Sequence, residues 1–182
     1  MTNVELVDRA RRGDRQAFDA LVAGMVDRLY SIARLILRDA DRAEDATQET
    51  LVRCWRDLPS LREPSRFDAW IHRLLIRAVH DEFRAQRRHS ANIRVLHAEP
   101  SQPDESGSVA LREELQLGFA RLTFEHRSVL VLRLYLGLSI DETAATIGIP
   151  AGTAKSRLHY ATEAMRLALE ANAQAPVREV SA

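Results

Sequence analysis

The stretch SRFDAWIHRLLIRAVHDEFRAQRR, residues 65–88, predicts a long helix with two different faces. Apolar residues recur every three or four positions, as on a helix packed against a core: Phe67, Trp70, Ile71, Leu74 and Ala78. Basic residues recur at the same spacing on the other face: Arg73, Arg77, His80, Arg84 and Arg87, extended by Arg88. Ser65, three residues before Asp68, predicts a capping box at the start. The basic stripe fits a polyanion, and it fits a solvated surface equally well.

Composition favours a globular protein, because 46% of the 182 residues are hydrophobic and 29% are charged. The 26 acids balance the 26 lysines and arginines, so a nucleic-acid function has to rest on how charge is distributed. The single cysteine, Cys54, excludes an intramolecular disulfide and a cysteine-rich zinc site. No apolar run approaches the ~20 residues that cross a bilayer, so we expect a cytoplasmic protein without membrane insertion.

The residues before the basic helix predict three further helices, and sustained strand alternation is missing. We expect a short helix over 4–11, a second that Asp14 caps and that continues to about Arg38, and a third over 41–57. The third should turn five residues toward a core: Ala43, Ala46, Thr50, Leu51 and Trp55. Its exposed side is acidic and polar: Glu44, Asp45, Gln48 and Glu49. This face is either solvated or docks a partner.

Charge and composition divide the chain into segments. Residues 39–57 carry six acids and three arginines, whereas residues 62–94 carry eight arginines and four acids. Residues 58–64 contain two prolines and predict a loop. Residues 91–109 are rich in Ser, Pro, Asp and Glu, which predicts a flexible acidic linker. We therefore expect an all-α chain made of two small helical domains joined by this linker. Its parts are a domain over 1–90, a linker over 91–109, a domain over 110–172 and a tail over 173–182.

The second domain contains the most specific pattern in the chain. Leu111, Leu115, Phe119 and Leu122 share one face, and Thr123 is placed to cap the next helix. Ser139 and Glu142 form a capping box, Gly148 supplies a turn, and Pro150 suits a first helical turn. Two groups should face the core: Ile140, Ala144 and Ile147, and then Ala154, Leu158, Ala161 and Met165. This pattern predicts a helix-turn-helix, although an ordinary helical hairpin remains the alternative.

In a helix-turn-helix, the start of the second helix enters the major groove of DNA. The residues placed to meet phosphates and base edges there are Gly152, Thr153, Lys155, Ser156, Arg157 and His159.

Four collinear motifs carry a resemblance to a known family. They are GDRQAFDALV at 13–22, DRAEDATQETLVRCW at 41–55, FDAWIHRLLIRAVHDEFR at 67–84 and GLSIDETAATIGIPAGTAKSRLHYA at 137–161. Through these motifs the chain resembles the sigma-70 family of RNA polymerase sigma factors. More narrowly, it resembles the two-domain extracytoplasmic-function (ECF) group of that family. The resemblance implies a region 2 helical bundle and a region 4 helix-turn-helix. It also implies a subunit that binds core polymerase, directs it to promoters and promotes initiation, without catalysis, cofactor or metal of its own.

The resemblance also implies a role for each charged face. Asp45, Gln48 and Glu49 fall where the family binds the clamp helices of the largest catalytic subunit. The basic face, Arg73, Arg77, His80, Arg84, Arg87 and Arg88, falls where the family engages and melts the −10 element, and residues 58–66 would hold a flipped base. The positions that read the −35 element hold Thr153, Lys155, Ser156, Arg157, His159 and Tyr160. An anti-sigma factor is a further expected partner. The linker would act as an RNA mimic in the polymerase cleft or as a solvated tether.

Four positions depart from the family pattern. Arg77 replaces a common asparagine in the −10 helix, so −10 specificity cannot be carried over. Thr123 replaces a common proline, and Ala154 replaces a larger aliphatic residue. Tyr160 replaces a common arginine, so the −35 sequence that this chain recognises also stays open.

Two other functions are alternatives to the sigma-factor hypothesis. A stand-alone helix-turn-helix regulator explains residues 139–170 but leaves the adjacent acidic and basic helices without a role. An enzyme is disfavoured because the sequence has no Gly-rich phosphate loop, no nucleophile elbow and no His-x-x-x-His or cysteine cluster.

Overall fold

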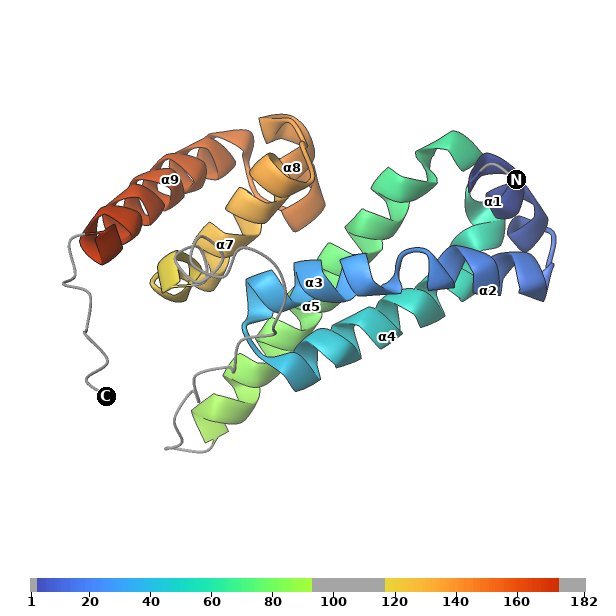
Figure 1. The fold of residues 1–182 in the computed structure, drawn as a ribbon, viewed down its shortest axis with the longest axis horizontal. Helices are drawn as coiled ribbons and strands as arrows, with labels where there is room; N and C mark the ends of the chain where they lie inside the picture. Colours follow the sequence, from blue (N-terminus) through green and yellow to red (C-terminus); the bar gives the residue numbers. More distant parts are fainter. Residues whose placement is uncertain (1–2, 93–116, 174–182) are drawn as a thin grey trace, which may run out of the picture. The chain divides into compact units, whose positions relative to one another are not determined.

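The computed structural model describes residues 3–92 and 117–173, and in these ranges every regular element is a helix (Figure 1). The chain divides into two compact units, residues 1–101 and 102–182. The prediction of an all-α fold is therefore confirmed. The predicted linker and tail lie outside the described residues, except for residues 91, 92 and 173, which are helical. Leu111 and Leu115, which were predicted to share a helix face, also lie outside the described residues. The predicted domain limits stay a prediction.

Unit 1 consists of α1 (Asn3–Arg11), α2 (Arg15–Ala23), α3 (Val26–Leu37), α4 (Ala40–Asp57) and α5 (Phe67–Asn92) (Figure 1). Helices α3, α4 and α5 pack on one another, and α1 packs on α2. Asp14 caps α2 by accepting from the Ala17 N–H, and Asp39 caps α4 by accepting from the Arg42 N–H, each at 3.1 Å. The core is made of fully buried aliphatic and aromatic side chains: Leu29, Ile32, Ile36, Phe67, Ile71, Leu75, Ile76 and Val79.

The expected single helix from Asp14 to Arg38 is wrong, because the chain breaks between α2 and α3. The Gly24 N–H bonds back to the carbonyls of Ala20 and Val22, and Met25 leaves helical geometry at φ −134°. Glycine costs about 1 kcal/mol relative to alanine inside a helix, so a break is cheap there. The apolar spacing continues across it, which is why periodicity alone did not detect it.

At its C-terminal end, helix α4 buries a different side from the one that the sequence predicts. Cys54 is completely buried, whereas Trp55, which was expected in the core, is 44% exposed and packs edge-on against Phe18 with ring centroids 4.8 Å apart. Thr47 and Thr50 are buried because their hydroxyls donate to the carbonyls of the preceding turn at 2.6 Å. Small residues on this side let α4 lie close to its neighbours.

The burial of Cys54 predicts an unreactive thiol. Burial, with a smaller contribution from the nearby Asp57 carboxylate, raises the pKa of Cys54 to about 12. The thiolate is the reactive form, so at pH 8 only roughly one Cys54 in ten thousand is ionised, against about a quarter for a free cysteine. We expect negligible reaction with a disulfide reagent in the folded protein and rapid reaction in urea. Fast labelling of the folded protein at pH 8 would contradict this placement.

The connection between α4 and α5 is more ordered than the predicted loop. It contains two 3-10 turns, η1 (Leu58–Ser60) and η2 (Pro64–Arg66), with Leu58 and Leu61 buried. The guanidinium of Arg11 donates to the Leu61 carbonyl at 2.8 Å, which ties the connection to α1. Ser65 lies inside η2, whose N-cap is Glu63, so the predicted capping role of Ser65 is wrong.

Unit 2 contains α7 (Phe124–Leu130), the π-helical turn η3 (Val131–Tyr135), α8 (Ile140–Ile147) and α9 (Ala151–Ala173) (Figure 1). Thr123 caps α7 as predicted, accepting from the His126 N–H at 3.3 Å. The nearly buried Arg127 donates to the Leu122 carbonyl at 2.6 Å. The core of this unit joins α7 to α9: Leu122, Val129, Leu130 and Ala161, with Phe119, Ile147, Leu158, Ala164 and Met165 packed around them.

The predicted turn between α8 and α9 is present in detail. Both bonds of the capping box form, from the Glu142 N–H to the Ser139 hydroxyl at 3.1 Å and from the Ser139 N–H to the Glu142 carboxylate at 2.8 Å. Gly148 adopts the left-handed conformation at φ 73°. Pro150 stands one residue earlier than predicted, just before α9, and its carbonyl accepts from the Ala154 N–H. Thr143 and Ala144 are the buried residues of α8, whereas Ile140 and Ile147 are half-buried.

Replacing Ser139 with alanine should destabilise α8 by about 1 kcal/mol, because the Glu142 N–H loses the hydroxyl oxygen to which it donates, while the backbone N–H of residue 139 keeps the Glu142 carboxylate as its acceptor. Hydrogen exchange of the α8 amides, measured in the full chain, should become faster and so report the loss of stability in this helix. Thr162→Ala is the control: its hydroxyl donates to the Leu158 carbonyl within α9, and its loss should change stability by less than about 0.5 kcal/mol. Unchanged exchange in Ser139→Ala would contradict the role of the cap.

Candidate functional site

The predicted acidic face of α4 is exposed. Ala43, Ala46, Thr47 and Thr50 turn the opposite side of this helix into the core, so Asp45, Gln48 and Glu49 face outward. The Gln48 amide donates to the Glu44 carboxylate at 3.1 Å, which leaves the acidic character of the face intact. Three carboxylates within two turns suit contact with a basic surface.

A groove of about 400 Å³ between α4 and α5 continues this face. Its lining includes Asp45, Gln48 and Glu49, and it also includes three residues that the sequence did not single out: Val52, Asp81 and Glu82. Val52 is one of the most exposed apolar residues of unit 1. Asp81 and Glu82 stand in the middle of the basic helix, and the only available signal in the sequence was that they interrupt its positive charge.

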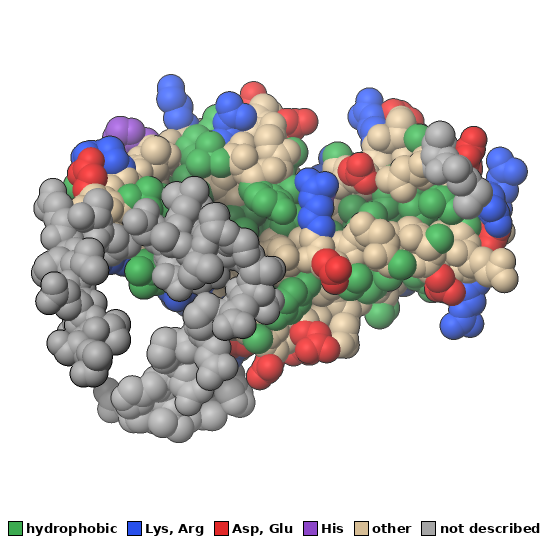
Figure 2. All heavy atoms as spheres, viewed as in Figure 1, with side chains coloured by type: hydrophobic (Ala, Val, Ile, Leu, Met, Phe, Trp, Pro, Cys, Tyr) green, Lys and Arg blue, Asp and Glu red, His purple; other side chains and the backbone are tan. Residues whose placement is uncertain are grey.

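The basic face of α5 is also exposed, with one exception. Arg73, Arg77, Arg84, Arg87 and Arg88 lie on the surface, whereas His80 is partly buried. Within residues 3–92, Arg84 is the member of this set that has an ion pair to an acid, Asp81. The other four arginines are available for phosphate groups, which arginine binds through two parallel hydrogen bonds. Figure 2 shows acidic and basic side chains interspersed on the visible face, in keeping with the zero net charge.

Arg53 connects the two charged helices. Its Nε donates to Glu49 at 2.7 Å within α4, and its Nη2 donates to Asp81 of α5 at 3.0 Å. Burial raises the pKa of Asp81, but hydrogen bonds from Arg84 and Arg53 outweigh burial and hold that pKa below its ordinary value. Asp81 is therefore ionised at neutral pH.

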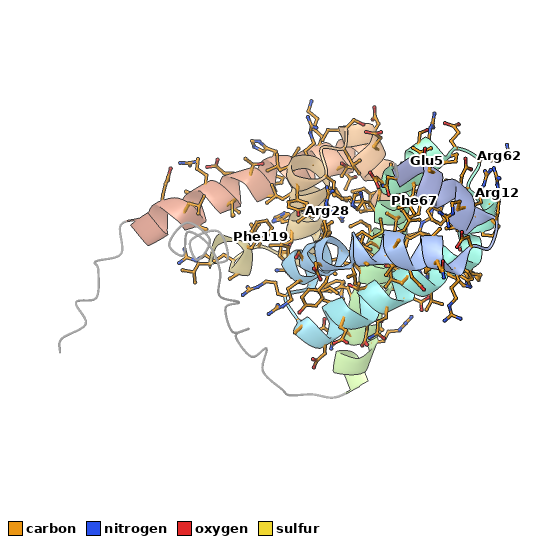
Figure 3. All side chains as sticks on the ribbon, turned by 45° about the vertical axis from the view of Figure 1, so that its right-hand side comes forward. Glu5, Arg12, Arg28, Arg62, Phe67 and Phe119 are labelled. Carbon is orange, nitrogen blue, oxygen red and sulfur yellow. The ribbon has the colours of Figure 1, made fainter. Side chains whose placement is uncertain are left out.

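The connection before α5 presents polar groups beside α1. Figure 3 shows Arg12 and Arg62 at this end of unit 1, where Arg11 binds the carbonyls of Leu61 and Arg62. Arg62, Ser65 and Arg66 are exposed, and Arg66 forms an ion pair with Glu63 at 2.6 Å. The buried Leu58, Leu61 and Phe67 anchor the segment.

The start of α9 presents the residues predicted for DNA contact on one exposed side. Lys155, Ser156, His159 and Tyr160 are exposed, while Thr153 and Arg157 are partly buried. Ala154 and Ala161 are fully buried and hold the other side of the helix on the core. The His159 and Tyr160 rings stand edge to face at 5.5 Å, and the Ser156 hydroxyl donates to the Thr153 carbonyl. The positive end of the helix dipole adds to the attraction for phosphate.

In the two described ranges, no three His, Cys, Asp or Glu side chains are grouped so as to hold a metal ion. None of the helices there is both long and apolar enough to cross a membrane.

Comparison with known proteins decides the family. A model described as Sigma-70 region 2 matches residues 21–89, and one described as Sigma-70, region 4 matches residues 118–167. The ECF RNA polymerase sigma factor SigL of Mycobacterium tuberculosis is 36% identical over 146 residues, which cover 78% of this chain and 82% of SigL. The chain belongs to the ECF group of the sigma-70 family. It is thus a transcription initiation factor that directs RNA polymerase to promoters.

Other relatives of this sigma factor agree over most of its length. The RNA polymerase sigma-H factor of Pseudomonas aeruginosa is 31% identical over 179 residues, covering 91% of this chain and 93% of the relative. Among solved structures, CnrH in complex with the cytosolic domain of CnrY matches with a TM-score of 0.61 and 25% identity, over 93% of this chain and 98% of that one. The sigma factor RpoE of Bartonella quintana, in complex with the anti-sigma factor NepR, shares the fold at a TM-score of 0.68 and 24% identity, over 84% and 96%.

Proposed function

We propose that this sigma factor divides its work among three surfaces: the acidic face of α4 for core polymerase, the arginines of α5 for the −10 element, and the start of α9 for the −35 element. The observation that carries the proposal is the pairing, in one packed unit, of an exposed acidic helix face with an exposed arginine-rich one. A stand-alone regulator needs the helix-turn-helix but has no use for that pairing.

The polymerase-binding residues are Asp45, Gln48 and Glu49. Their outward orientation supports docking to the clamp of the largest catalytic subunit, where opposite charge speeds encounter and fixes the register of the two surfaces. The groove between α4 and α5 extends this surface to Val52 and Glu82. Val52 supplies apolar area that a charged face alone lacks.

The −10 surface consists of Arg73, Arg77, Arg84, Arg87 and Arg88, together with His80. Opening the duplex costs a few kcal/mol for each extruded base, so contacts to the freed strand must offset that cost. Arginine is suited to this because it binds phosphate and stacks on bases. The ordered segment 58–66 is the candidate holder of the flipped base. Arg77 replaces an amide and should grip phosphate rather than read a base.

The −35 surface lies on the helix-turn-helix of α8 and α9, which places the start of α9 in the major groove. Lys155, Arg157 and Ser156 are the candidates for phosphates and base edges, with Thr153, His159 and Tyr160 beside them. The factor itself needs no catalytic residue or cofactor, because the polymerase makes the RNA. Polymerase and promoter both place its work in the cytoplasm.

An anti-sigma factor is the proposed regulator. RpoE and CnrH, two structural relatives of this chain, are seen in complexes with NepR and with the cytosolic domain of CnrY. The exposed charged faces of α4 and α9 are the surfaces that such a protein would have to cover in order to block polymerase and DNA.

The test is to mix the purified full chain with core RNA polymerase, isolate the complex by gel filtration and carry out run-off transcription on a promoter library. We expect a stoichiometric complex and transcription from a distinct set of promoters with shared −10 and −35 sequences. The failure of this complex to form, together with tight binding of the protein alone to duplex DNA, would favour the stand-alone regulator instead.

A further inference from the structure

A chain of three ion pairs joins the proposed polymerase-binding face to the proposed −10 face. Glu49 binds Arg53, Arg53 binds Asp81, and Asp81 binds Arg84. The first two residues lie in α4 and the last two in α5, so the chain crosses between the helices. Its ends are residues of the two proposed interfaces, and its middle members, Arg53 and Asp81, belong to neither set.

Each middle member is shared between two partners. Arg53 uses Nε for Glu49 and Nη2 for Asp81, and Asp81 uses Oδ2 for Arg53 and Oδ1 for Arg84. A guanidinium and a carboxylate bind most strongly when two parallel hydrogen bonds join them. Arg53 and Asp81 cannot reach that arrangement while each is also held by an outer partner. The side chain of Arg53 is 22% exposed, whereas that of Arg84 is 67% exposed. The Asp81–Arg84 pair is therefore easier to break than the Arg53–Asp81 pair.

We propose that Asp81 withholds Arg84 from DNA in the free protein and that core polymerase, by engaging Glu49, releases it. A cationic group of the polymerase competes with Arg53 for Glu49. Arg53 then turns its second donor to Asp81, and the carboxylate loosens its hold on Arg84. Arg84 becomes available to a phosphate of the −10 strand. This inference rests on the proposed function, because it requires that Glu49 meets polymerase and Arg84 meets DNA.

The coupling acts in both directions, as linkage requires. A phosphate on Arg84 frees Asp81 to bind Arg53, which in turn exposes Glu49 to polymerase. The arrangement favours DNA contact by the polymerase-bound protein over contact by the free protein. Exposed ion pairs are weak, so the expected size of the effect is about two- to fivefold in affinity.

The experiment compares Asp81→Asn with the wild-type full chain, free and bound to core polymerase. The free protein is titrated with a labelled random-sequence single-stranded oligonucleotide, which reports phosphate contacts. The holoenzyme is titrated with a forked fragment of a promoter from the transcription assay. Asp68→Asn is the matched control, since it removes one exposed carboxylate from the same helix and Asp68 has no part in the ion-pair chain.

We expect free Asp81→Asn to bind the oligonucleotide about two- to fivefold more tightly than the wild type, and the holoenzyme affinity to change by less than about twofold. The slope of log affinity against log salt for the free variant should steepen by about 0.7, the value for one added phosphate contact on a single strand. A purely structural role for Asp81 would leave this slope unchanged. Equal tightening of the free and bound forms, or tightening without a steeper slope, would overturn the proposal.

Arg53→Gln supplies a second test with the opposite sign. Without Arg53 to compete for it, Asp81 keeps its hold on Arg84 in the holoenzyme, so binding to the forked fragment should weaken by about two- to fivefold. Unchanged binding would also overturn the proposal. Failure of the wild-type protein to bind core polymerase would instead refute the proposed function itself, and the relay with it.

Discussion

Charge reversal of Asp45 and Glu49 to lysine should reduce affinity for core RNA polymerase by at least about 100-fold, since like charges facing each other across an interface cost several kcal/mol. Both side chains are exposed on α4 and contribute nothing to the buried core. The variant should therefore fold normally. Its affinity for core is measured by competition with the labelled wild-type protein, and its fold by circular dichroism and thermal unfolding.

The matched control for this variant is Asp19→Lys with Asp27→Lys. Both residues are exposed on α2 and α3 of the same unit, and the change in net charge is identical. This control should bind core within about threefold of the wild type, because long-range screened charge has little effect on a specific contact. Equal loss of binding in both variants would show that overall charge, and not the α4 face, governs the interaction.

Replacing Arg157 with alanine should weaken binding to the −35 element by about 1–3 kcal/mol, or roughly 5- to 150-fold, if the guanidinium contacts a base edge. Arg157 lies on the second turn of α9 and is partly buried. The measurement is holoenzyme binding to promoter fragments with every single substitution in the −35 element. The loss should be concentrated at the one or two base pairs that Arg157 reads.

Arg166→Ala is the control on the same helix. Hydrogen bonds to Glu163 and Glu170 raise the pKa of Arg166 and hold its guanidinium on its own helix. It lies more than two turns beyond Arg157, so its loss should not alter the preference for −35 sequences. An Arg157→Ala effect that is equal on all sequences would mean that Arg157 contacts only phosphate.

Much of the local structure was predictable because it depends on hydrogen bonds between residues only a few positions apart in the sequence. Asp14, Thr123 and Ser139 cap helices by accepting from an N–H three residues further on. Gly148 turns the chain because it alone tolerates the left-handed geometry there without strain. The family motifs also sit on such local elements, which is why the two helical units and the family were identified together.

Two of the errors lie where packing decides between neighbouring residues. Apolar spacing placed Trp55 inside, yet the close approach of α4 to its neighbours admits the smaller Cys54 and leaves Trp55 on the surface against Phe18. His80 shares the arginine stripe at helical spacing but is partly covered. Periodicity gives the direction of a side chain around its own helix, and it does not give the position of the adjacent helix.

By itself, the sequence determined the all-helical fold, the caps of α2, α7 and α8, the helix-turn-helix and the outward direction of the acidic residues of α4 and the arginines of α5. The tertiary structure alone decided how the charged faces of unit 1 connect. Arg53 and Asp81 are 28 residues apart, and the Arg11 bond to the Leu61 carbonyl spans 50. Such contacts depend on how helices cross in space, which no spacing along the chain encodes, whereas a cap depends only on the turn that contains it.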